Sequence, residues 1–284
     1  MTGICRGIAT PCFGTEPEAL AELGVQAEAA GFDGFFIWDH ILFANDGEGP
    51  DILDPWVALA LVAARTKRIR LGTMITPLSR RRPWVLARQC ATLDRLSNGR
   101  MILGVGLGSP VEGDFGRFGE ETNARVRAEM LDEGLEVFNG LSSGERFAFD
   151  GVHYRLKPMR FTPTPIQRPR IPIWVGGVLP ATRPMDRAAR WDGAVPIRFA
   201  GRQVVRPSAS DIASVRDHIA AQRNTMDGYD IVVWSEMAES SAELSAQPGI
   251  IEHYRDAGAS WWIETGRPTP GWWEGLQERV ARGL

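Results

Sequence analysis

The residues best suited to chemistry in this sequence are Asp39 and His40, which follow a short apolar run at Gly34–Trp38. The ordinary pKa of histidine is about 6.5, so His40 can give or take a proton at neutral pH, and the adjacent carboxylate could orient it or a bound cofactor. A capping or core histidine is the alternative, because a single Asp-His pair is common. The other histidines are expected to be structural or solvated: His153, His218 and His253.

Two glycine-rich stretches could bring backbone close to a ligand, since glycine tolerates positive φ and leaves room for a phosphate or a planar ring. The first spaces Gly104, Gly106 and Gly108 two residues apart. This spacing is not the GxGxxG dinucleotide fingerprint, and tight turns explain it equally well. The second stretch, Gly176-Gly177, precedes an expected helix whose N-terminus could hold an anion.

Basic and aromatic residues gather at three further places. The run Arg80–Arg82 could meet an acidic group, although three basic residues before a helix are more typical of a solvated face. The tryptophan pairs Trp261-Trp262 and Trp272-Trp273 are expected to dock the last helix against the rest of the protein, because terminal elements need tying down. Lining an aromatic substrate pocket is the alternative role.

The elements that must position these residues alternate between strand-length apolar runs and segments of helical periodicity, which predicts parallel strands with crossover helices. The strands are expected at Ile4–Ala9, Gly34–Trp38, Ile69–Ile75, Met101–Gly106, Ile173–Gly176, Gly193–Pro196, Asp230–Ser235 and Ala259–Ile263. The helices are expected at Pro17–Ala30, Pro55–Ala64, Trp84–Leu96, Arg125–Asn139, Ala181–Arg190, Ser210–Arg223, Pro248–Ala257 and Gly271–Ala281. These units predict an α/β fold, a (β/α)8 TIM barrel, with a doubly wound open sheet as the alternative. Residues 1–284 are expected to form one domain, since no low-complexity linker divides them.

An insertion between strands four and five is predicted over about residues 109–172, because this gap is far longer than one crossover needs. Within it, Phe147–Phe149 and Val152–Tyr154 flank Asp150-Gly151 and are expected to form a hairpin. The proline-rich run Thr162–Pro172 suits neither a helix nor a central strand and is expected to lie extended over the barrel. Barrel function gathers at the C-terminal ends of strands, so His40 and both glycine stretches are expected at one end.

Composition narrows the classes of function. The 284 residues carry 32 basic and 35 acidic side chains and a net charge of -3, which leaves no excess charge for nucleic acid or a membrane surface. Three cysteines without CxxC spacing predict neither a disulfide framework nor a zinc site, and with no targeting or spanning segment they indicate a cytoplasmic protein. A metal-dependent hydrolase is disfavoured, because only one of four histidines is well placed for a ligand set.

Several motifs in a fixed order resemble the bacterial luciferase-like monooxygenase family. The similarity extends over about residues 15–197 and is weak beyond. It is carried by the segments Gly31–His40, Ala63–Thr73, Ser97–Gly106, Phe149–Tyr154, Ile171–Gly177 and Ala189–Gly193. The resemblance implies a TIM barrel that binds FMN or the deazaflavin coenzyme F420 at its C-terminal face. The Asp-His ending of the second strand is similar to the F420-dependent branch, whereas the flavin-dependent branch usually has Glu-His there.

The resemblance also implies roles for individual residues. His40 matches a residue that donates a proton or stabilises the cofactor ring, and Asp39 matches one that contacts the cofactor. A cis peptide bond under the ring would fall at Met74–Ile75, and Gly176 and Gly177 match backbone that binds the phosphate end. With the strand-end glycines, the candidate cofactor-binding residues are Asp39, Met74, Ile75, Thr76, Gly106, Gly108, Gly176 and Gly177.

One departure from the family concerns Ser109, which stands where the related sugar-phosphate dehydrogenases have a catalytic glutamate. We therefore expect this chain to share the reaction class of these relatives but not glucose 6-phosphate as the substrate. We expect an oxidoreductase that moves a hydride between F420 and a small organic substrate, with His40 as proton donor or acceptor. The alternatives are an FMN-dependent monooxygenase served by a separate flavin reductase, and a barrel that binds such a ligand without turnover. The family resemblance further implies a homodimer.

Overall fold

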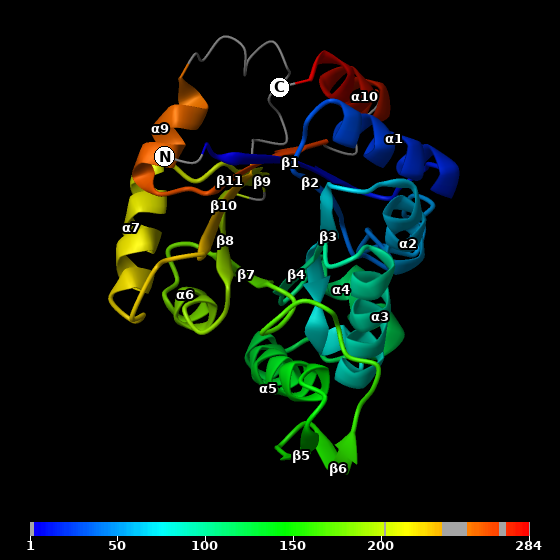
Figure 1. Ribbon diagram of the computed structural model, residues 1–284, viewed down its shortest axis with the longest axis vertical. Coiled ribbons are helices and arrows are strands. Elements are labelled where there is room, and N and C mark those ends of the chain that lie inside the picture. The colour runs from blue at the N-terminus through cyan, green and yellow to red at the C-terminus, as the bar shows by residue number, and fades with distance from the viewer. Residues whose placement is uncertain (1–2, 202, 235–248, 267–270, 284) are drawn as a thin grey trace.

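A closed barrel of parallel strands forms the centre of the protein. The computed structural model describes residues 3–201, 203–234, 249–266 and 271–283, and within them eight parallel strands pair in order around a ring (Figure 1). They are β1 (Cys5–Thr10), β2 (Gly34–Ile37), β3 (Arg70–Pro77), β4 (Met101–Gly106), β7 (Ile173–Val178), β8 (Gly193–Ala200), β10 (Asp230–Trp234) and β11 (Trp261–Thr265). Pairing of β10 with β8 and of β11 with β1 closes the ring. The (β/α)8 prediction is confirmed, and the open-sheet alternative is wrong.

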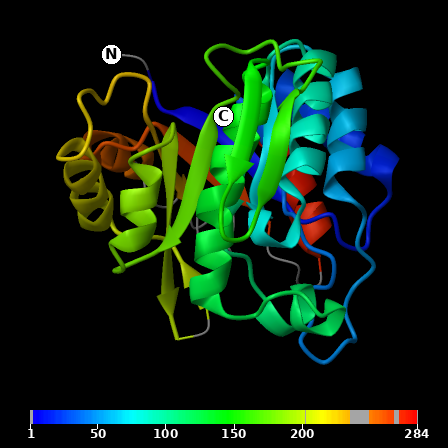
Figure 2. The same ribbon diagram turned by 90° about the horizontal axis from the view of Figure 1, so that it is seen from below.

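Helices surround this barrel on its outside (Figure 2). They are α1 (Pro17–Ala29), α2 (Pro55–Arg65), α3 (Pro83–Leu96), α5 (Ala124–Ser142), α6 (Arg183–Ala188), α7 (Ala209–Ala220), α9 (Ile250–Ala257) and α10 (Trp272–Arg282). Local signals set several starts: the Asp54 carboxylate accepts hydrogen bonds from the backbone N–H groups of Trp56 and Val57, and Pro55 occupies the first turn of α2. No helix in the described ranges has the length and apolar character needed to cross a bilayer.

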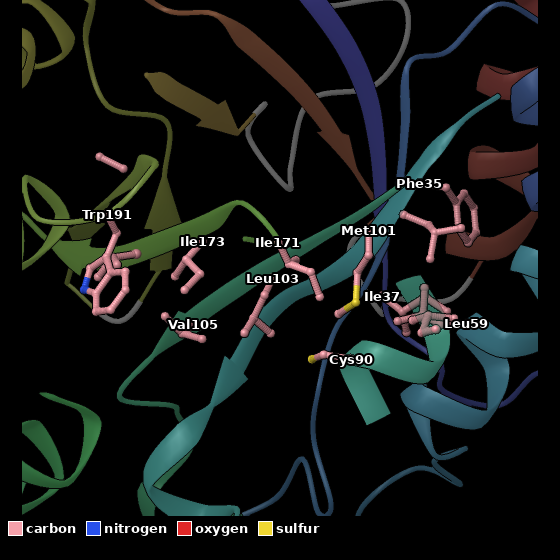
Figure 3. Close-up of a cluster of buried hydrophobic side chains, with 14 of the residues drawn as sticks. Phe35, Ile37, Leu59, Cys90, Met101, Leu103, Val105, Ile171, Ile173 and Trp191 are labelled. Carbon is pink, nitrogen blue, oxygen red and sulfur yellow. The ribbon is translucent and has the colours of Figure 1, made fainter. Parts of the chain in front are cut away.

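The apolar interior has two layers separated by the strands. Between strands and helices lies the larger layer, of which Figure 3 shows a part; Phe35, Leu59, Met101 and Leu103 are fully buried there. The barrel lumen holds the smaller layer, in which the Trp174 ring centroid lies 5.3 Å from that of Phe36 and 5.2 Å from that of Trp261. The lumen is therefore filled by aromatic side chains rather than open.

The C-terminal tryptophans divide between these layers. Trp272 and Trp273, at the start of α10, pack against the outer layer, in agreement with the expected docking of the last helix. Trp262 lies in the same layer, but its ring centroid is 5.5 Å from that of Tyr254 on α9. Trp261 does not serve that purpose: it faces the lumen, because successive side chains of a strand point to opposite faces.

The chain between β4 and β7 contains α4 (Val111–Asp114), η2 (Gly116–Phe118), the crossover helix α5 and an antiparallel hairpin of β5 (Arg146–Asp150) and β6 (Arg155–Arg160). The hairpin is confirmed, but its second strand begins at Arg155 rather than covering Val152–Tyr154. The Glu133 carboxylate explains the shift, because it accepts the backbone N–H groups of Val152, His153 and Tyr154 at 2.8, 2.9 and 3.0 Å. These donors are thus unavailable for strand pairing.

The proline-rich run after the hairpin has no regular secondary structure, as expected, and a buried carboxylate holds it. Asp94, fully buried on α3, accepts the backbone N–H groups of Ile166 and Gln167 and the Gln167 side-chain amide. The same amide donates to the Met101 carbonyl at 2.8 Å. The run is therefore fastened to the beginning of β4.

A buried guanidinium joins two of the family-like motifs. Arg100, just before β4, donates to the carbonyl oxygens of Ala63, Thr66 and Ile69 at 2.7–3.0 Å. It thereby satisfies carbonyls that the C-terminus of α2 leaves without helical partners. From the other side, the Glu28 carboxylate accepts the backbone N–H groups that lead into β3. In the turn between α2 and β3, the backbone carbonyl oxygens are thus bonded by Arg100 and the backbone N–H groups by Glu28.

Candidate active site

His40 lies just beyond β2 and is held by a carboxylate from the insertion. Its Nδ1 atom is 2.7 Å from Oδ2 of Asp114, whose side chain is fully buried. The other carboxylate oxygen accepts the backbone N–H groups of Ile41 and Leu42 at 2.8 and 3.0 Å. Asp114 therefore fixes both the imidazole and the backbone that carries it.

The tight fit of α4 against the loop after β2 explains how Asp114 reaches His40. A Cβ at Gly113 would collide with the carbonyl oxygens of Leu42 and Ala44, so only glycine permits this approach. The Gly113 N–H donates to the Asn45 side chain at 3.3 Å, and Arg117 donates to the Asn45 carbonyl at 2.9 and 3.1 Å. The insertion is thus part of the site.

The charge state of Asp114 follows from opposing influences. Burial by itself raises the pKa of this carboxyl. The hydrogen bond and the charge interaction with His40 lower the pKa, and so do the hydrogen bonds from the backbone N–H groups of Leu42 and Ile41. Together they outweigh burial and hold the pKa below its ordinary value. An ionised carboxylate only accepts hydrogen bonds, so Nδ1 of His40 carries a hydrogen. Within the described residues, Nε2 has no hydrogen-bond partner, and it is the atom left for a reacting group.

Asp39 points away from His40 into a different network. Its carboxylate, with no exposed surface, accepts hydrogen bonds from Arg80, Arg81, the Thr76 hydroxyl and the Trp56 indole at 2.6–3.2 Å. Burial raises the pKa of Asp39, yet the Arg81 and Arg80 charges and the hydrogen bonds from Arg81 and Thr76 lower it below its ordinary value. The solvated face expected for Arg80–Arg82 is wrong for Arg80 and Arg81, because both guanidiniums neutralise a buried carboxylate.

Ile75 projects an apolar side chain at the end of β3. The Met74–Ile75 peptide bond is cis, as the family resemblance implies, and the pairing of β3 with β4 shifts register here. Met74 is buried in the lumen, whereas Ile75 remains partly exposed. A Cβ at Gly106 would lie 2.6 Å from Cδ1 of Ile75, and one at Gly176 would collide with the same atom. These two glycines make room for the Ile75 side chain.

The remaining candidate glycines serve close backbone packing. Gly108 has φ +81° and lies against Pro77, while a Cβ at Gly177 would collide with Pro184 of α6. The helix expected at Ala181–Arg190 is present as α6, but it is short: it begins at Arg183 and spans six residues, and β7 continues through Gly176-Gly177 to Val178. The Thr76 hydroxyl contacts Asp39 and Thr73, each at 2.8 Å, so it supports the end of β3 from beneath.

Aromatic rings surround the imidazole of His40. The ring centroids of Phe43, Phe13 and Trp38 lie 4.8, 5.8 and 6.1 Å from that of His40. Trp234, at the end of β10, stacks on Trp38 at 6.5 Å with an interplanar angle of 16°. The described ranges contain no group of three His, Cys, Asp or Glu side chains that could hold a metal ion.

Sequence reasoning missed Asp114 and the phenylalanines at 13 and 43. Asp114 lies 74 positions from His40 inside the insertion, and no local pattern distinguishes it from Glu112. The only hint was chemical: the strand-four motif lacks the family's acid at Ser109, and an acid follows five residues later. Phe13 and Phe43 lie in loops, where periodicity gives no indication of which side chains face the site.

A (β/α)8 barrel with a histidine-carboxylate pair and a cis peptide at the C-terminal ends of its strands is thus the class of protein that the geometry defines. The sequence model described as luciferase-like monooxygenase matches residues 7–247. The chain belongs to the luciferase-like monooxygenase family.

Curated relatives include F420-dependent glucose-6-phosphate dehydrogenases. The enzyme from Microbacterium testaceum is 37% identical over 178 residues, which cover 61% of this chain and 51% of that protein. The enzyme from Nakamurella multipartita is 34% identical over 221 residues, covering 76% and 62%. The matched regions thus amount to about half to three fifths of these relatives' lengths.

Solved structures share the fold over the whole chain. An F420-dependent secondary alcohol dehydrogenase in complex with an F420-acetone adduct superposes with a TM-score of 0.75 at 16% identity, covering 99% of this chain and 100% of the other. The coenzyme F420-dependent tetrahydromethanopterin reductase from Methanopyrus kandleri gives a TM-score of 0.73 at 18% identity, covering 100% and 99%. At these identities the likeness concerns the fold.

Proposed function

We propose that this protein is an oxidoreductase that transfers a hydride between coenzyme F420 and a small organic substrate, with His40 as proton donor or acceptor. The observation that carries the proposal is the His40–Asp114 pair, which leaves Nε2 free of described partners. The choice of coenzyme is supported by the two F420-dependent glucose-6-phosphate dehydrogenases described above, which are 37% and 34% identical in sequence to the matched parts of this chain.

The end of β3 fits one face of a planar ring. Ile75 presents a partly exposed apolar side chain, and the missing Cβ atoms of Gly106 and Gly176 let it lie flat across β4 and β7. Met74, Ile75 and the backbone at Gly106, Gly108, Gly176 and Gly177 would hold the coenzyme, with Asp39 and Thr76 supporting them from below. When bound, the deazaflavin supplies the carbon that gives or accepts a hydride.

His40 would manage the accompanying proton. Because Nδ1–H donates to Asp114, Nε2 carries a lone pair in the neutral imidazole and a hydrogen in the imidazolium. The neutral form can accept the proton of an alcohol, and the cation can return one to a carbonyl oxygen. The carboxylate of Asp114 stabilises the cation and keeps the ring oriented.

An FMN-dependent monooxygenase is the second candidate, supported by the monooxygenase character of solved structures with this fold. A monooxygenase from Streptomyces bottropensis superposes with a TM-score of 0.69 at 21% identity, covering 99% of this chain and 98% of the other. Such an enzyme would require a separate flavin reductase and would consume oxygen with product formation.

Titration of the purified protein with F420 and separately with FMN tests the proposal, using tryptophan fluorescence and the emission of each ligand. Saturable micromolar or tighter binding of F420 alone supports it. Preference for FMN favours the monooxygenase, and binding of neither favours a barrel without turnover. Light scattering on the same sample tests the homodimer, which we propose from the family.

A further inference from the structure

Asp114 lies on a helix that is too short to hold its own position. α4 has only four residues, far fewer than a helix needs to be stable by itself. The loop after β2 contacts α4 through Gly113 and through the N–H groups that the Asp114 carboxylate accepts. The orientation of Asp114 toward His40 therefore depends on these contacts and on whatever else fastens α4 to the barrel.

The guanidinium of Arg127 fastens the chain directly next to Asp114. Arg127 lies near the start of α5 and is only 3% exposed, and its Cζ atom is 4.5 Å from the ring centroid of Phe115. Nη1 of the same guanidinium donates to the carbonyl oxygens of Leu107 and Gly108 at 2.6 and 3.3 Å. Both carbonyls lie beyond the last paired residue of β4. Arg127 thus connects the end of β4 to the residue that follows Asp114.

The Phe115 ring is closely packed at this junction. It is fully buried, and a Cβ at Gly108 would lie 3.0 Å from its Cε2 atom. The backbone N–H of Phe115 donates to the Val111 carbonyl at 3.1 Å and so closes α4. A shift of Phe115 would therefore displace the preceding residue, Asp114.

The position of Arg127 is an expensive one for a cation. Burial lowers the pKa of Arg127, against the opposing effect of the Glu121 charge, and Nε has no partner among the described residues. An apolar side chain of similar volume would avoid this desolvation. It would lack the directed bonds that hold the end of β4 and the residue after Asp114 to one side chain. Packing alone therefore does not account for an arginine here.

We infer that Arg127 is a positioning residue of the candidate site, acting on His40 through Asp114. Its guanidinium fixes Phe115 against the end of β4, and Phe115 sets the neighbouring Asp114. The carboxylate of Asp114 in turn keeps the ring hydrogen of His40 on Nδ1. The part of Arg127 in catalysis rests on the proposed function, whereas its effect on the imidazole can be measured without coenzyme.

Arg127→Met tests this role, because methionine keeps much of the volume but has no hydrogen-bond donor. ¹⁵N NMR at about pH 9, where an ordinary imidazole is neutral, gives the ratio of the two His40 tautomers. The His40 signals are assigned by their absence from the spectrum of His40→Ala. The matched control is Arg100→Met, because Arg100 is also a buried guanidinium bonded to carbonyl oxygens but lies before β4, at the opposite end of the strand. Urea unfolding measures the stability of both variants.

We expect wild type to show about a tenfold or greater excess of the Nδ1–H tautomer, as one hydrogen bond to a charged group implies. The excess should fall several-fold in Arg127→Met and stay at the wild-type value in Arg100→Met, although both variants lose stability. In an Asp114→Asn background, Arg127→Met should change the ratio no further, because the two residues act in series. Arg127→Lys should lie between wild type and Arg127→Met, since an ammonium keeps the charge but not the planar fork.

A wild-type ratio in Arg127→Met would show that Arg127 only stabilises the fold and would overturn the positioning role. Equal shifts in Arg127→Met and Arg100→Met, or a further shift in the Asp114→Asn background, would also overturn it. If Arg127→Met does not fold, Arg127→Lys decides, and a wild-type ratio there has the same meaning. Titration with F420 separates the two proposals: failure to bind would overturn the proposed function, while the tautomer ratios would still decide the role of Arg127.

Discussion

The Nδ1 atom of His40 lies 2.7 Å from Oδ2 of Asp114, although 74 positions separate the two residues in the chain. His40 follows the second barrel strand, whereas Asp114 comes from the insertion between strands four and five. An insertion that the sequence marks only as an interruption thus supplies the group that orients the candidate catalytic histidine.

Replacing His40 by alanine should remove proton transfer without removing the coenzyme site. We expect kcat to fall by roughly 10²–10⁴-fold, the usual contribution of a general acid or base, with F420 affinity within a few-fold of wild type. Steady-state kinetics and fluorescence titration measure the two quantities. His253→Ala, on the exposed face of α9, is the control and should be silent. Unchanged turnover in His40→Ala would remove His40 from the mechanism.

Asp114→Asn should disturb the imidazole more than the fold. An asparagine side chain can donate to Nδ1, which would move the ring hydrogen to Nε2 and reverse the role of that atom. We expect kcat to fall roughly tenfold or more with a changed pH-rate profile, and ¹⁵N NMR of the imidazole should report the other tautomer. The control is Asp186→Asn, because Asp186 forms a comparable 2.7 Å pair with His218 on the exterior of the barrel. A wild-type tautomer and pH profile would contradict the positioning role.

Stability should decline at acid pH through Asp39. The pKa of Asp39 in the folded protein is lower than its ordinary value of 3.8, so its contribution to stability is complete well above pH 3.8 and is lost as the pH falls through the folded-state pKa. Asp39→Asn should lower the free energy of unfolding by about 3–5 kcal/mol at neutral pH, since it leaves the buried guanidinium of Arg80 and the partly buried one of Arg81 without their carboxylate. Urea unfolding between about pH 7 and pH 3 should show this difference shrinking toward the acid end. Asp46→Asn, on an exposed loop, should leave the curve unchanged. A difference independent of pH would mean that Asp39 titrates alike in both states.

Gly176→Ala should displace the Ile75 side chain from the end of β3. The new methyl would collide with Cδ1 of Ile75, so we expect about 1–3 kcal/mol of destabilisation and weaker F420 binding. Ile75→Val removes Cδ1, and the double variant should recover the stability lost in the single alanine variant. Chemical denaturation and coenzyme titration of the four proteins complete the cycle. Gly275→Ala is the control, since no described atom lies within 4 Å of its new methyl. Additive losses in the double variant would show that Ile75 and Gly176 do not interact.

Local chemistry in the sequence sufficed for the order of strands and helices. Pro17 and Pro55 begin their helices as expected, and β4 has the bounds that its apolar run predicts. Helix starts and strand runs depend on residues only a few positions apart, so they can be read from a single sequence. The hairpin strand at Val152–Tyr154 was misplaced because a distant side chain, Glu133, captured its backbone donors.

For the candidate site, the sequence was enough to predict that His40 and the glycine stretches meet at one end of a barrel, because parallel strands bring their C-terminal ends together. The partners of these residues could be found only in the folded chain. Asp114 reached His40, and Arg80 and Arg81 turned inward to Asp39, through contacts between segments tens of residues apart. Charge on a sequence does not reveal whether a side chain is solvated or paired, since that depends on which buried group the folded chain places beside it.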